Sequence, residues 1–389
     1  MASFRRTLRF PVWLLAVAGL AVAPAAAAKS SPKTSLELLA EYNLPGGARF
    51  EGACIGGLSA LAFDPEQARY YAVSDSRRDA RFFTLRIDLG ETTGEDGSTR
   101  PSLAGVTFER VTRLRTREGQ LYPDDRVDPE GLVLIGDGTA YLSSEGAADL
   151  GVPPFVDRID LATGEWLATA PIPLAFKPRH DAASDGSTQS QGVRSNLGFE
   201  SLTGTPDGRL LYAATESALA QDVGDPEATQ ERYARVLRFE VGKTPRLTGE
   251  FLYPLRVPDG NVVAHGLVEM LALDNAGRLL AMERTWGPEI GMVIKLFEVD
   301  LQSQRPDVDR SRLSPAARSL AVLDKQLVLD LTELPVVLDN LEGLTFGPKL
   351  ADGSQSLLML GDNDNTECQP PQSLAQMRPT KFLLFRLLY

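Results

Sequence analysis

The sequence predicts an all-β fold, a β-propeller of five four-stranded blades, and three observations support this prediction. A pattern recurs five times, and its origins are 71, 70, 69 and 73 residues apart, at Ser59, Glu130, Glu200, Glu269 and Glu342. Each repeat contains segments with the residue alternation of half-buried strands. No long amphipathic helical pattern interrupts them. A six-bladed ring with one degenerate blade is the alternative.

The first two strands of each repeat enclose a short turn. In the second repeat, Gly131–Ile135 is short and apolar, Gly136–Gly138 is a turn, and Thr139–Ser143 is the next strand. The five equivalent stretches are LSALAFDPEQARYYAVSD from Leu58, EGLVLIGDGTAYLSSE from Glu130, ESLTGTPDGRLLYAATE from Glu200, EMLALDNAGRLLAMER from Glu269 and EGLTFGPKLADGSQSLLMLGD from Glu342.

The outer two strands of each repeat are rich in β-branched and aromatic residues. Third strands begin near Arg81, Phe155, Arg235, Met292 and Lys381, and fourth strands near Val106, Glu165, Leu247 and Lys325. The fifth repeat ends at Tyr389 without a fourth strand, so we expect Ser35–Leu44 to supply it and close the ring. Lys177–Leu197 and Gln302–Leu323 are predicted insertions.

The first 28 residues have the pattern of a secretory signal peptide. A basic start with Arg5, Arg6 and Arg9 precedes the apolar stretch Phe10–Val22 and a run of alanines, which predicts cleavage before Lys29. An uncleaved anchor and the twin-arginine export route are alternatives. We therefore expect a single domain over residues 29–389, exported to the periplasm or secreted, with no membrane span after cleavage.

The charge of the chain limits its partners. The signal segment holds three of the 40 basic residues and no acid, so the net charge of −12 becomes −15 after cleavage. Such an acidic protein is not expected to bind nucleic acid or anionic membranes, because like charges repel. We expect a monomer that takes small anionic or ester substrates, together with cations.

The two cysteines are Cys54 and Cys368, at opposite ends of the predicted domain. Because export permits disulfides, we expect a bond between them that reinforces the closure of the ring, with two unpaired buried thiols as the alternative.

Acidic residues recur at the start of the first strand and at the exit of the second. Both positions should lie at one mouth of the central channel. Hard oxygen ligands of this kind suit calcium or magnesium rather than zinc, so the carboxylates are candidate metal ligands. The alternative is a structural role, in which each acid accepts hydrogen bonds from the neighbouring blade. The candidates are Asp75, Glu130, Glu145, Glu200, Glu216, Glu269, Glu283, Glu342 and Asp362.

Residues that break the fivefold pattern are further candidates. Ser59 replaces the acid of the first repeat, and five arginines fall near the mouth, where guanidinium groups can bind phosphate or carboxylate. We expect substrate binding by Arg77, Arg78, Arg126 and Arg194, with counter-charge to the acids as the alternative. His265 and Arg284 are the candidate catalytic residues.

Three runs carry a resemblance to a known family. They are GGLSALAFDP…YYAVSDSR from Gly56, RSNLGFESLTGTPDGRLLYAATES from Arg194 and LEGLTFGP…LMLGDNDN from Leu341. They resemble the exported phytase-like family, also called "esterase-like activity of phytase", which implies a β-propeller distantly similar to calcium-dependent propeller phytases. EGLVLIGDGTAYLSSE is similar to a calcium-binding segment of those enzymes, which implies that Glu130, Glu145, Glu200 and Glu216 are ligands.

Three functions follow as hypotheses. The first is a calcium-dependent hydrolase of phosphate or other esters. The second is a non-catalytic binding or scaffold propeller of the cell envelope. The third is a calcium-dependent lactonase-like propeller. No G-x-S-x-G or H-E-x-x-H motif occurs, which argues against a serine hydrolase elbow and a zinc protease.

Overall fold

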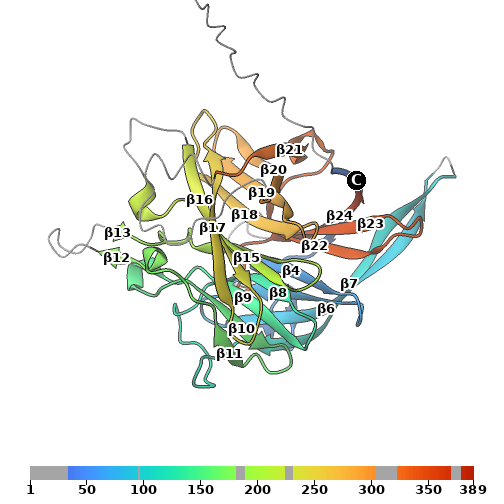
Figure 1. Ribbon diagram of the computed structural model, residues 1–389. Helices are drawn as coiled ribbons and strands as arrows, with labels where there is room; N and C mark the ends of the chain where they lie inside the picture. The colour runs from blue at the N-terminus through green and yellow to red at the C-terminus, as the bar shows by residue number, and fades with distance from the viewer. Residues whose placement is uncertain (1–33, 95–96, 181–188, 224–230, 303–321, 369–377) are drawn as a thin grey trace, which may run out of the picture. The chain divides into compact units, whose positions relative to one another are not determined.

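The computed structural model describes residues 34–94, 97–180, 189–223, 231–302, 322–368 and 378–389. Their strands form five four-stranded antiparallel sheets in chain order (Figure 1). This confirms the predicted propeller with five blades. The predicted signal peptide, residues 1–28, lies outside the described residues, as does most of the insertion Gln302–Leu323. No helix among the described residues is long and apolar enough to cross a membrane.

Blades 1 to 4 each follow the strand order of the chain, from the innermost strand outward. Blade 1 is β4 (Leu58–Asp64), β5 (Arg69–Ser74), β6 (Arg81–Thr93) and β7 (Thr99–Arg113). Blade 2 is β8 (Pro129–Leu134), β9 (Thr139–Ser144), β10 (Phe155–Asp160) and β11 (Trp166–Thr169). Blade 3 is β14 (Phe199–Gly204), β15 (Leu210–Thr215), β16 (Glu231–Glu240) and β17 (Arg246–Arg256). Blade 4 is β18 (Ala264–Ala272), β19 (Arg278–Gly287), β20 (Gly291–Asp300) and β21 (Lys325–Asp330).

Blade 5 joins the two ends of the chain. It consists of β22 (Asn340–Lys349), β23 (Gln355–Asp362), β24 (Thr380–Leu388) and β1 (Ser35–Leu44). The N-terminal strand β1 pairs antiparallel with β24, from Ser35 opposite Leu388 to Leu44 opposite Thr380, as predicted. In Figure 1 the dark blue start of β1 accordingly lies beside the red C-terminal end.

Short hairpins and 3-10 helices lie in the loops between the blade strands. Two small hairpins are β2 (Arg49–Phe50) with β3 (Ala53–Cys54), and β12 (Arg179–His180) with β13 (Gln189–Gln191). The second hairpin lies in the predicted insertion Lys177–Leu197. The part of the chain that the structure describes also contains four short 3-10 helices, namely η1 (Ala148–Leu150), η2 (Leu174–Phe176), η3 (Ala220–Asp222) and η4 (Leu331–Glu333).

The core is divided among the seams between blades. The described residues contain five apolar clusters, and each cluster combines side chains from two neighbouring blades. The innermost strands also contact each other around the ring, in the order β4, β8, β14, β18, β22 and back to β4. Burial of apolar surface between blades therefore closes the ring and sets one end of every innermost strand at the same mouth.

A disulfide reinforces the seam between blades 1 and 5. Cys54 in β3, just before blade 1, is bonded to Cys368 in the loop after β23, and 314 residues separate them. Arg81 holds the same loop, because its guanidinium donates to the carbonyl oxygens of Thr366, at 2.9 Å, and Cys54, at 2.7 Å. Thr366 and Cys368, which follow β23, are thereby attached to the first blade.

Candidate metal and substrate site

A cavity of about 960 Å³ opens at the end of the ring where innermost strands begin and second strands exit. We call it the mouth cavity. Five of the nine predicted carboxylates line it, namely Asp75, Glu130, Glu200, Glu342 and Asp362. They come from blades 1, 2, 3 and 5, so the closed ring brings together residues that are far apart in the sequence.

Six carboxylates form a continuous buried group, which we call the carboxylate cluster: Asp128, Glu130, Glu145, Glu200, Glu216 and Glu342. Within it, three overlapping triads each have ligand oxygens within 4.8 Å of one another. The central triad, Glu130, Glu200 and Glu342, comes from the innermost strands of blades 2, 3 and 5. Oxygen donors at such spacing suit a hard divalent cation such as calcium.

The segment Asn196–Glu200 positions part of this cluster. Asn196 has a φ of 54°, a left-handed conformation that asparagine tolerates better than most residues. The N–H of Gly198 donates to Oε1 of Glu145 at 2.5 Å. A Cβ at residue 198 would lie 2.5 Å from the Cα of Glu145, so only glycine allows blades 2 and 3 this close approach.

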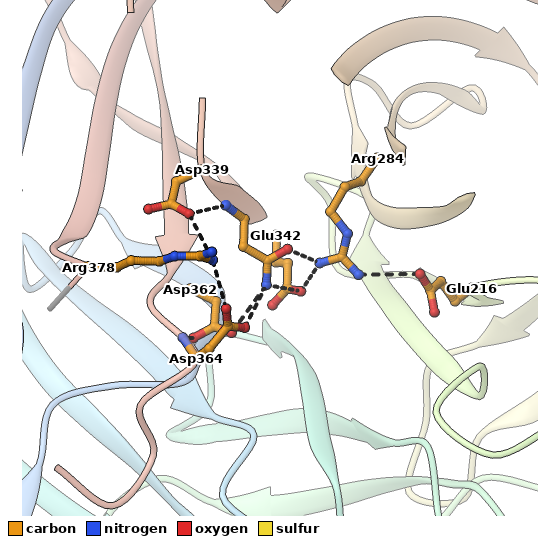
Figure 2. A network of polar contacts seen from close by, with 8 residues as sticks. Glu216, Arg284, Asp339, Glu342, Asp362, Asp364 and Arg378 are labelled. Carbon is orange, nitrogen blue, oxygen red and sulfur yellow. Dashed lines mark hydrogen bonds and ion pairs between the residues drawn. The ribbon is translucent and has the colours of Figure 1, made fainter. Parts of the chain in front are cut away.

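Two arginines supply positive charge to the cluster. Arg77 donates to Asp128 and, at 2.8 Å, to Oδ1 of Asn196. Figure 2 shows Arg284 between two blades, where it pairs with Glu342 on one side and with Glu216, at 3.4 Å, on the other. Among the described residues, no ion pair reaches Glu130, Glu145 or Glu200.

A polar network connects the cluster to the rim of the cavity (Figure 2). Asn340 donates to Glu342 at 3.0 Å and to Asp362 at 3.3 Å. Arg378 pairs with Asp364 at 2.9 Å and with Asp339 at 3.4 Å. This part of the mouth is therefore fixed by hydrogen bonds within blade 5.

Burial is the main cause of the raised pKa values in the carboxylate cluster. It raises the pKa of all six carboxyl groups, and the rise is large for Glu130, Glu145 and Glu200, because neighbouring carboxylates add repulsion. Burial and the charges of Glu342, Asp128 and Asp364 likewise raise the pKa of Asp75. Its buried Oδ1 accepts no hydrogen bond from any described residue. The residues present thus fit a divalent cation, which would relieve the repulsion and provide the missing positive charge.

Four predicted acids lie away from the cavity wall. Glu145 and Glu216 belong to the carboxylate cluster behind it. Glu269 instead accepts the N–H groups of Met270 and Leu202, at 2.8 and 3.3 Å, and so connects blades 3 and 4. Glu283 accepts hydrogen bonds from Lys325 and, at 2.7 Å, from the hydroxyl of Tyr253. The last two have the contacts expected of the structural alternative.

The other predicted residues also separate into two sets. Arg77, Arg78 and Arg284 line the mouth cavity. Arg126 is exposed and Arg194 donates to Ala218 and Ser217, and neither lines the cavity.

His265 is buried beside Thr285, and burial with the charges of Lys325 and Arg232 lowers its pKa to about 4. It does not line the cavity either. Ser59 is buried as well.

Sequence reasoning missed several residues of this site. Asp128 stands two residues before Glu130, and Asp364 two residues after Asp362, so a search around each repeated acid would have found both. Asn340 likewise precedes Glu342 by two residues. Arg378 and Trp286 have no signal in the repeat, because their positions at the mouth depend on how blades 4 and 5 fold.

The buried carboxylates predict a specific pH dependence in the presence of a chelator. Because the pKa of Glu200 is raised in the folded protein above its ordinary 4.5, the fold binds more protons than the unfolded chain, and stability falls as pH rises above 4.5 toward the raised value. Each unit of pKa corresponds to about 1.4 kcal/mol. We expect wild type to lose stability relative to Glu200→Gln between pH 5 and pH 8, measured by urea unfolding.

The comparison of wild type with Glu200→Gln cancels the titration of His265, whose lowered pKa makes stability fall as pH decreases below about 6.5. An equal stability difference between the two proteins at both pH values would contradict the expected charge of Glu200.

The family model "Phytase-like: Esterase-like activity of phytase" matches residues 54–365. An "Uncharacterized secreted protein" of Arthroderma benhamiae is 30% identical over 141 residues, which are 33% of this chain and 27% of that protein. This chain thus matches about a quarter of the length of that relative.

Two solved structures are similar at low sequence identity. The periplasmic gluconolactonase PpgL of Pseudomonas aeruginosa has 14% identity and a TM-score of 0.34, over 90% of this chain and 99% of that one. The endo-arabinase of Bacteroides thetaiotaomicron has 11% identity and a TM-score of 0.39, over 90% of this chain and 97% of that one.

Proposed function

This chain belongs to the phytase-like family ("esterase-like activity of phytase"). We propose that it is an exported, calcium-dependent hydrolase of phosphate or other esters. The disulfide Cys54–Cys368 and the secreted relative support the export. The mouth cavity is the proposed active site.

The observation that carries this proposal is the carboxylate cluster. Six buried acids with two paired arginines leave an excess of negative charge at the bottom of a cavity, and three triads have oxygens spaced for a cation. Asp128, Glu130, Glu145, Glu200, Glu216 and Glu342 would hold calcium. A purely structural acid would more simply be paired, as Glu283 is with Lys325.

The residues of the mouth have separate roles in the proposed reaction. Bound calcium would supply the positive charge that polarises the ester and activates a water molecule. Arg77 and Arg284 would bind the anionic oxygens of the substrate and stabilise the charge that develops on them. Oδ1 of Asp75, which is buried and has no hydrogen-bond partner among the described residues, would accept a proton from the attacking water.

The test is hydrolysis of a panel of phosphomonoesters, phosphodiesters, carboxylic esters and lactones, with calcium and with chelator. We expect turnover of at least one phosphate or carboxylic ester that is lost with chelator and restored by calcium. Glu298→Gln is the control, because Glu298 lies near the far end of β20, close to Arg278, and outside the mouth cavity.

The panel also separates the competing functions. Absence of metal-dependent turnover on every compound would contradict the hydrolase and favour a binding or scaffold propeller. Turnover of lactones alone would contradict the proposed hydrolase of phosphate or other esters and would favour a lactonase.

A further inference from the structure

Blade 4 departs from the fivefold pattern at the mouth. In blades 1, 2 and 3 the second strand ends one residue before its repeated acid, and in blade 5 it ends at that acid. In blade 4, β19 continues past Glu283 to Gly287 and is joined to β20 through Pro288–Ile290. The hairpin β19–β20 therefore extends further at the mouth than the second strands of the other blades.

The extension creates an apolar wall. Ala264 on β18 pairs with Trp286 on β19, which in turn pairs with Met292 on β20, so the three form one row across the sheet. All three line the mouth cavity, together with Leu338 from the connection to blade 5. Trp286 is 41% exposed, so part of its ring is available to a ligand.

Blades 1 and 5 contribute charged side chains to the cavity wall. Arg77, Arg78 and Arg378 line it there, beside acids of blades 1, 2 and 5. Arg78 pairs with Glu367 at 2.9 Å and its side chain is 62% exposed, so it can turn to an incoming anion. A ligand in the cavity can thus meet the guanidinium groups of blades 1 and 5 as well as the apolar row of blade 4, where Arg284 also lines the cavity.

We propose that the site selects anionic esters with an aromatic alcohol, such as aryl phosphates. The aryl ring would contact Trp286, and the anionic group would lie toward Arg77, Arg78 and Arg284. This rests on the proposed function and adds the substrate class to it. Polyol phosphates would leave the apolar wall exposed to water, whereas an aryl group buries it and gains ring contact with the indole.

Binding of two non-hydrolysable probes to the calcium-loaded protein tests this without turnover. Phenylphosphonate and methylphosphonate carry the same anionic group and differ in the ring. We expect phenylphosphonate to bind at least about tenfold more tightly, measured by titration calorimetry. In a Trp166→Phe background, Trp286 is the sole tryptophan of residues 29–389, and its fluorescence should change with phenylphosphonate.

Two variants separate the contribution of the apolar row from that of the arginines. Trp286→Leu should weaken phenylphosphonate about tenfold and leave methylphosphonate unchanged. Arg78→Gln should weaken both probes by the same factor, because it removes charge but no apolar surface. Thermal unfolding with calcium checks that each variant is folded.

The outcomes also distinguish this inference from the proposed function. Equal affinity for the two probes, loss of both probes in Trp286→Leu, or binding of neither probe would overturn the aryl preference, even if esters are hydrolysed. A tenfold preference that depends on Trp286, in a protein that hydrolyses no ester, would support the site and reject the hydrolase.

Discussion

Glutamine in place of Glu200 is expected to remove both the calcium-dependent stabilisation and the calcium-dependent turnover. Glu200 is the carboxylate shared by the central triad with Glu130 and Glu342 and by the triad with Glu145 and Glu216. A neutral amide keeps the shape of the side chain but removes the charge that a cation requires. We expect turnover to fall by about 100-fold or more, because even changes of the residues that support metal ligands cost about 10–100-fold.

The same substitution should have the opposite effect on the protein without metal. Burial and the charges of Glu145, Glu216 and Glu342 oppose the ionisation of Glu200, so removing its charge relieves repulsion. With chelator at pH 8, Glu200→Gln should therefore unfold at a higher temperature than wild type. Calcium should raise the unfolding temperature of wild type and leave that of Glu200→Gln nearly unchanged.

Glu298→Gln is the matched control, since it changes a partly buried glutamate of blade 4 outside the mouth cavity. It should respond to calcium as wild type does. If Glu200→Gln is less stable than wild type with chelator and still responds fully to calcium, Glu200 has a structural role and the metal site is excluded there.

Loss of the Cys54–Cys368 bond is expected to lower the free energy of unfolding by roughly 4–5 kcal/mol, somewhat less than the about 5.7 kcal/mol that the chain-entropy model gives for a loop of this length. The bond joins segments 314 residues apart, and it acts at the seam where β1 and β24 also close the ring. Without it, the unfolded chain gains conformational freedom, whereas the native pairing is unchanged.

The measurement is urea unfolding of Cys54→Ala/Cys368→Ala with chelator present. Reductant should bring wild type to the midpoint of the double variant and should not affect the variant itself. Equal midpoints for the variant and oxidised wild type would show that strand pairing and apolar contacts alone determine the stability of the seam.

Much of the fold could be predicted from the sequence because a propeller blade is a local structure. Strand alternation, turn residues and the spacing of the repeats all lie within about 70 residues, and the strands of each blade pair with one another. The closing strand could also be predicted, since the fifth repeat lacks a fourth strand and Ser35–Leu44 has strand character.

The candidate site could be predicted only in part. Asp75, Glu130, Glu200, Glu342 and Asp362 were expected at the mouth and line its cavity. Glu269 and Glu283 have the same repeat positions as Glu200 and Glu216, but their contacts differ. Glu283 lies beside Lys325 and Tyr253, whereas Glu216 lies beside Arg284, and these partners come from strands with no shared pattern.

By itself, the sequence thus determined the five blades, their order, the closing strand and the end of the ring where the acids gather. Only the tertiary structure decided which acids form one cluster, which are paired with an arginine of a neighbouring blade, and that the longer hairpin of blade 4 brings Trp286 to the cavity. The reason is that a repeat specifies the position of a residue within its own blade. The charge and shape of the site depend on side chains from different blades, such as Arg284 and Glu216, which are adjacent only after the ring has closed.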